Sequence, residues 1–178
     1  YPSFIRNEAS SQKMKALKIV TKNGMDIVNI HKKWIMDRDV CYYALLNNGL
    51  ALQYILDNDT YGEYVLTAVS SNGLSLQFIE EQWKNDKEIA ILAVENNGLA
   101  LEYVNPDIVD YEDIALSAVS ENGLALQYVN FDFDKYDYTD IMITAILQNN
   151  NALQYADFSN HIKLYSNKPK VQNKIIND

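Results

Sequence analysis

The sequence repeats a unit of about 25 residues. Residues 93–104 read AVENNGLALEYV, and residues 118–129 read AVSENGLALQYV. When the chain is aligned on the glycine of NGLALQY, six copies follow one another at intervals of 24 to 27 residues. The aligned positions are Gly24, Gly49, Gly73, Gly98, Gly123 and Asn150. A period of this length is typical of proteins in which each unit is stabilised by packing on its neighbours.

An asparagine precedes the glycine position in every copy. We interpret the Asn-Gly pair as a helix stop, in which the glycine takes a left-handed conformation that it reaches without steric cost. In the sixth copy Asn150 stands at this position, and asparagine is the next most tolerant residue. An Asn-Gly pair is also typical of hairpin turns, but the flanking residues lack the alternation that strands require. The asparagines are Asn23, Asn48, Asn72, Asn97, Asn122 and Asn149.

The residues before the glycine position have helical spacing. In KEIAILAVENN (87–97), Ile89, Ala90, Ala93 and Val94 fall on one face of a helix. Alanine recurs five residues before the glycine position, which indicates close helix packing there. These alanines are Ala44, Ala68, Ala93, Ala118 and Ala145, and Ile19 is the exception. An acid recurs ten residues before the glycine position, and we expect it to interact with the positive end of the helix dipole or to cap free amides. These acids are Asp39, Glu63, Glu88, Asp113 and Asp140.

After the glycine position, six residues such as LALQYV precede a turn, so we expect a second, short helix. Its third place holds leucine or isoleucine, and an aromatic residue follows two places later in most copies. A helix this short depends on its neighbours for stability. The sequence therefore predicts an all-α protein, an α-solenoid of about six helix-turn-helix repeats. We expect residues 1–11 to form an N-terminal extension, 12–157 the six-repeat helical solenoid and 158–178 a basic C-terminal segment.

The wording NDKEIAILAVENNGLALEYV resembles a repeat family, domain of unknown function 4116, whose most recognisable part is NGLALQY. The resemblance covers roughly residues 12 to 157, and the first and last copies depart from the pattern as capping repeats do. It implies a helical repeat fold and brings no established activity. The chain has a single cysteine, Cys41, which fits a reducing compartment. We therefore expect an intracellular protein, cytoplasmic or in a viral or host cytosol.

Charge is distributed unevenly along the chain, whose net charge is −9. Residues 1–38 carry eight Lys or Arg against three acids, whereas residues 39–157 carry three Lys against twenty acids. An acidic middle repels phosphate backbones and favours basic protein partners. The apolar runs are too short to span a bilayer. We therefore expect a protein partner that is basic or extended, with no nucleic acid and no membrane.

The residues that commonly carry chemistry are few. Cys41 could pair with His31 or His161 as nucleophile and base or as metal ligands. However, its position in the repeat is one where we expect a small buried side chain. Acidic linkers at 57–63 and 131–140 are similar to calcium loops but lack an essential glutamate or glycine. We expect no cofactor, no metal and no catalytic residue. Trp34 and Trp83 could stack bases, but apolar packing is the expected role.

A single polar place recurs within each short helix and is our hypothesis for a binding site. It holds Gln53, Gln77, Glu102, Gln127 and Gln154. Stacked repeats would align these side chains into a polar ladder suited to an extended segment. The alternative is that each amide satisfies backbone groups of its own turn. The sequence thus predicts a non-enzymatic protein–protein interaction scaffold. A recognition or regulatory arm of a larger multidomain enzyme or effector is the second reading, and the acidic middle disfavours an RNA-reading solenoid.

Overall fold

The computed structural model describes residues 2–55, 61–132 and 138–157. Within these ranges every element of regular secondary structure is a helix, and no strand is present. The all-helical prediction is confirmed. The expected C-terminal segment 158–178 lies outside the described residues. The α-helices are α1 (Pro2–Lys22), α2 (Lys32–Ile35), α3 (Arg38–Asn47), α4 (Tyr61–Ser71), α5 (Glu81–Lys84), α6 (Lys87–Asn96), α7 (Tyr111–Glu121) and α8 (Thr139–Gln148).

A 3-10 helix of six residues follows each long α-helix. These helices are the short second elements that the sequence predicts. They are η1 (Gly24–Asn29), η2 (Gly49–Tyr54), η3 (Gly73–Phe78), η4 (Gly98–Tyr103), η5 (Gly123–Tyr128) and η6 (Asn150–Tyr155). The four-residue helices α2 and α5, which the sequence analysis does not predict, follow η1 and η3.

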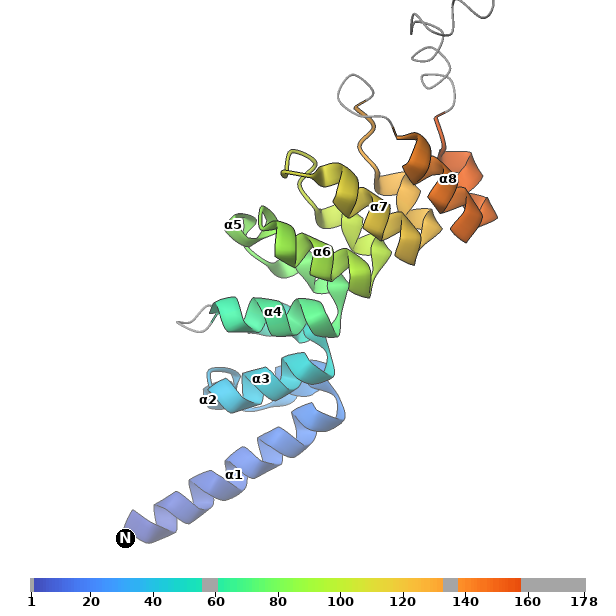
Figure 1. Cartoon of the computed structure of the whole chain (residues 1–178). Coiled ribbons are helices and arrows are strands. Elements are labelled where there is room, and N and C mark those ends of the chain that lie inside the picture. The colour runs from blue at the N-terminus through green and yellow to red at the C-terminus, as the bar shows by residue number, and fades with distance from the viewer. Residues whose placement is uncertain (1, 56–60, 133–137, 158–178) are drawn as a thin grey trace, which may run out of the picture.

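The repeats form two layers. Each long helix packs on the next one in the order α1, α3, α4, α6, α7, α8, and each 3-10 helix packs on the next 3-10 helix. In Figure 1 the long helices fan out, with their N-terminal ends on the wide side and their C-terminal ends on the narrow side. Because α1 begins at Pro2, the expected extension at 2–11 is continuous with the helix of the first repeat.

The core lies between the two layers and follows the predicted helix face. Ile89, Ala90, Ala93 and Val94 are all buried in α6, as their spacing predicts. The five column alanines are fully buried, whereas Ile19 is 40 % exposed. Among the described residues no preceding repeat packs on α1, which explains the exposure of Ile19. The leucines three residues after the glycine position are at most 3 % exposed in the inner repeats, but Leu153 is 55 % exposed because no described repeat follows it.

The prediction that the glycine takes a left-handed conformation is wrong. None of the glycines in the described residues has a positive φ, and the asparagine before each glycine position is extended instead. This asparagine ends the long helix, and its side chain accepts a hydrogen bond from the second residue of the 3-10 helix, as Asn97 does from the Leu99 amide at 3.1 Å. The Asn residue therefore caps the following helix, which accounts for its presence in every copy.

Glycine is required for a different reason, which is close packing between repeats. A Cβ on Gly49 would overlap the carbonyl oxygen of Ala68 in the next repeat. The glycines at 24, 73, 98 and 123 meet the next column alanine in the same way. The alanine column is thus a close contact, as predicted. The contact is made with the start of the preceding 3-10 helix in addition to the neighbouring α-helix. This close approach lies at the C-terminal ends of the long helices, on the narrow side of the fan (Figure 1).

Candidate interaction surfaces

The polar places of the 3-10 helices are exposed at the surface and hydrogen-bonded locally. Each of the four glutamines donates its amide to the backbone carbonyl three residues earlier, at 2.9 to 3.0 Å. The acceptors are Leu50, Leu74, Leu124 and Asn151 for Gln53, Gln77, Gln127 and Gln154. These bonds favour the structural role of the column. A role in recognition stays a prediction, because the side chains also face solvent.

Glu102 is the exception in this column, because a carboxylate cannot donate such a bond. It lies close to the phenols of Tyr103 and Tyr128, which follow the polar place in η4 and η5. Desolvation raises the pKa of both phenols, and the Glu102 carboxylate raises the pKa of each further. The polar and aromatic columns are therefore coupled at the centre of the array, where one acid interacts with tyrosines of two repeats.

A clamp between repeats involves the last residue of four long helices, α3, α6, α7 and α8, and the sequence analysis missed it. The backbone amide at the glycine position donates to the side chain that ends the long helix of the next repeat, at 2.5 to 2.7 Å. The pairs are Gly24 with Asn47, Gly73 with Asn96, Gly98 with Glu121 and Gly123 with Gln148. The amides of Asn47, Asn96 and Gln148 also donate to a carbonyl near the end of the preceding long helix, at 2.9 to 3.0 Å.

Three of the five first-turn acids form ion pairs between repeats. A basic residue eleven places before the glycine position bonds to the acid ten places before the next one. The pairs are Lys13–Asp39 at 2.6 Å, Arg38–Glu63 at 2.7 Å and Lys87–Asp113 at 3.6 Å. The Lys13 ammonium lowers the pKa of the Asp39 carboxyl, and the carboxylate in turn raises the pKa of Lys13. Because the pairs are exposed, solvent screens them and they contribute little to stability.

The acids that cap α3 and α6 are not the first-turn acids that the sequence predicted. Asp37 caps α3 by accepting from the amides of Asp39 and Val40, and Asp86 caps α6 in the same way. The predicted acids lie within the first turn, where their negative charge interacts favourably with the positive end of the helix dipole.

Cys41 and His31 have structural roles. Cys41 is fully buried, its thiol donates to the Ile35 carbonyl at 2.9 Å, and burial raises its pKa to about 11. His31 caps α2 by accepting from the Lys33 amide at 3.3 Å. His161, the other predicted candidate partner of Cys41, lies outside the described residues, as do 56–60 and 133–137 of the acidic linkers. No group of three potential metal ligands occurs in the described part of the chain.

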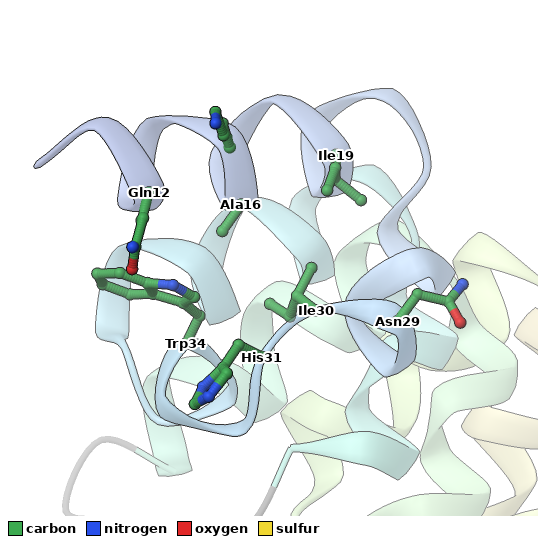
Figure 2. Close-up of a pocket in the computed structure, with 8 residues that line it drawn as sticks. Gln12, Ala16, Ile19, Asn29, Ile30, His31 and Trp34 are labelled. Carbon is green, nitrogen blue, oxygen red and sulfur yellow. The ribbon is translucent and has the colours of Figure 1, made fainter. Parts of the chain in front are cut away.

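Both tryptophans are half-buried and pack against the core, as expected. Trp34 also lines an open concavity of about 360 Å³ beside the first repeat. Figure 2 shows Gln12 of α1 directed toward Trp34, with Ile19 of α1 and Ile30 on the same side of the helix. The Lys33 ammonium lies 4.6 Å from the centre of the Trp34 ring and bonds to Gln12 at 2.7 Å. These contacts join α1 to α2, the short helix after η1.

The comparisons with known proteins agree with the repeat pattern. The family model described as domain of unknown function (DUF4116) matches residues 62–109 and 111–161, which is more than half of the 178-residue chain. No curated protein and no solved structure matches the chain. None of the helices in the described residues combines the length and hydrophobicity needed to cross a membrane. The chain belongs to the DUF4116 family, whose function is unknown, and it contains the family's sequence pattern in tandem.

Proposed function

We propose that the chain is a non-enzymatic scaffold for protein–protein interaction, built as an α-solenoid of six helical repeats. The observation that supports this most strongly is the equivalence of exposed positions. Every 3-10 helix from η2 to η6 exposes a polar residue at the same place, and α3, α4, α6, α7 and α8 each expose an acid in the first turn. A surface on which consecutive repeats present the same chemistry is suited to an extended partner.

The roles of the packing and capping residues support the same proposal. Cys41 and His31 are committed to packing and capping, and the alanine and glycine columns are committed to contact between repeats. A partner that is basic is favoured by the acidic middle of the chain, which carries three Lys against twenty acids in residues 39–157. The same charge disfavours nucleic acid as a partner.

Affinity purification with the purified chain as bait, followed by mass spectrometry, tests the proposal. A captured protein must then bind the purified chain directly in isothermal titration calorimetry, with a defined stoichiometry. We expect such a partner to contain a basic segment. If no captured protein binds the purified chain directly, or if the chain alone turns over a captured metabolite, the scaffold proposal is wrong.

A further inference from the structure

The outer face of the long helices carries two parallel rows of side chains. The first, the acid row, consists of the residues ten places before the glycine position. Three residues later each helix has a large apolar residue, and these form the apolar row. The acid row is Asp39, Glu63, Glu88, Asp113 and Asp140, and the apolar row is Tyr42, Leu66, Ile91, Leu116 and Ile143. Residues three apart lie on the same side of a helix, so the two rows run side by side across five helices.

Burial in the core does not account for the large apolar side chains of the apolar row. Ile91 and Leu116 are half-buried and pack against it, but Tyr42, Leu66 and Ile143 are 36 %, 50 % and 51 % exposed. Single exposed apolar residues are ordinary on a protein surface. Here, however, a large apolar side chain recurs at the same outward position in every helix of the series. Recurrence of this kind indicates a shared role at the surface.

The apolar row deepens into a groove between α3 and α4. The groove has a volume of about 640 Å³. Tyr42 and Leu46 of α3 form one wall and Leu66 of α4 forms the other, and Leu46 is 55 % exposed. The remaining lining residues are polar, namely Asn47, Thr67, Ser70 and Ser71. An apolar side chain of a partner would be covered here on two sides.

The polar lining of this groove can accept hydrogen bonds but has few protons left to donate. The hydroxyls of Thr67, Ser70 and Ser71 all donate to backbone carbonyls, at 2.9, 2.7 and 3.2 Å. The Asn47 amide is engaged with the first repeat through both its oxygen and its nitrogen. The free lone pairs of the hydroxyl oxygens therefore favour a partner that supplies donors.

The charge around the rows favours a cationic partner. Helices α3, α4, α6, α7 and α8 carry eight acids and two basic residues, Arg38 and Lys87. Both basic residues already form ion pairs, Arg38 with Glu63 at 2.7 Å and Lys87 with Asp110 at 2.6 Å. A second copy of the chain on this face would bring acids against acids, and phosphate groups would be repelled.

We propose that this face binds a basic, amphipathic segment of a partner protein. Its large apolar side chains enter the α3–α4 groove and lie along the apolar row, and its Lys and Arg side chains face the acid row. The proposal rests on the scaffold function above and adds to it the surface and the chemistry of the partner. It places recognition on the long-helix face, away from the polar column of the 3-10 helices.

A fluorescein-labelled peptide of 18 residues tests the proposal, with leucine and lysine arranged as an amphipathic helix. Binding to the 178-residue chain is measured by anisotropy. One double variant, Leu46→Ser with Leu66→Ser, alters the groove, and another, Glu63→Gln with Glu88→Gln, alters the acid row.

The charge-matched control, Glu80→Gln with Glu81→Gln, removes two exposed acids that lie outside both rows. A glutamine variant, Gln53→Ala with Gln77→Ala, tests the polar column of the 3-10 helices as the alternative site. All four sites are exposed in the groove and acid-row variants, and circular dichroism verifies that each variant is folded.

We expect the groove and acid-row variants to bind the peptide at least about ten-fold more weakly, and the control to stay within about two-fold of the parent. A scrambled peptide of the same composition should bind more weakly than the amphipathic one. Equal binding by all variants, equal binding of an acidic leucine–glutamate peptide, or no binding overturns the inference. Loss of binding in the glutamine variant alone also overturns it, but leaves the scaffold function intact. Tighter, row-dependent binding of a 20-nucleotide RNA would replace the peptide partner by a nucleic acid.

Discussion

The Cα of Gly98 lies against the carbonyl oxygen of Ala118 in the next repeat, so closely that a Cβ on Gly98 would overlap that oxygen. The Gly98 amide also donates to the Glu121 side chain at the end of the same helix. The glycine column of each repeat and the alanine column of the next repeat are therefore two sides of one contact, although the paired residues are 19 to 22 positions apart in the sequence. This contact sets how closely the two layers of successive repeats approach each other.

Gly98→Ala should destabilise the protein although alanine adds only one carbon. The added Cβ forces the backbones of two repeats apart, and overpacking of this kind costs about 1 to 3 kcal/mol. Asn150→Ala is the matched control, because this position already carries a Cβ and no described repeat packs on it. We expect its free energy of unfolding to change by no more than about 0.5 kcal/mol. Urea denaturation measures both, and equal midpoints would contradict the close contact.

Asn96→Ala should weaken the clamp between the third and fourth repeats. It removes an acceptor for the Gly73 amide at 2.7 Å and a donor to the Ser70 carbonyl at 2.9 Å. At about 0.5 to 1.5 kcal/mol per hydrogen bond, we expect a loss of about 1 to 3 kcal/mol in the free energy of unfolding. Glu95→Ala changes the adjacent exposed residue and serves as the control in the same denaturation experiment. A control that loses as much stability would show that helix propensity, and not the clamp, is measured.

The Cys41 thiol should not react in the folded protein at neutral pH. Its burial raises the pKa from 9.0 to about 11, so the reactive thiolate is scarce and also shielded. Since the unfolded chain loses this proton first, the thiol's contribution to stability is present below about pH 9 and is lost as the pH rises toward 11. Reaction with a thiol-specific chromogenic reagent should occur only after denaturation. Rapid modification of the native chain at pH 7 would contradict this burial.

The Asp39 carboxyl should titrate below its ordinary range, because the Lys13 ammonium stabilises its charged form. A lowered pKa means that the pair stabilises the fold above the ordinary pKa of 3.8, and that this stabilisation is lost as the pH falls through the lowered value. NMR titration of the carboxyl carbon measures the shift. Lys13→Met should bring the Asp39 pKa back toward its ordinary value, whereas Lys15→Met should leave it unchanged. An unchanged titration in Lys13→Met would show that the pair does not form in solution.

The repeat number, the helical class and the buried face of each long helix could be predicted from the sequence, because they depend on local patterns. Ile89, Ala90, Ala93 and Val94 fall on one face for any helix with 3.6 residues per turn, whatever lies beside it. The place where each long helix ends was also predictable, since asparagine caps a following helix through bonds within two residues of itself.

The reason for glycine was decided only by the tertiary structure. The sequence favoured a left-handed turn at Gly98, whereas the requirement comes from the Ala118 carbonyl of the next repeat. The clamp of Asn96 and the pairing of Lys13 with Asp39 were hidden for the same reason, since each joins residues 23 to 26 positions apart. A column in an alignment shows which residue recurs, but the partner across a repeat boundary depends on the register in which two helices stack. That register is set by the packing of side chains from both repeats, which no single repeat contains.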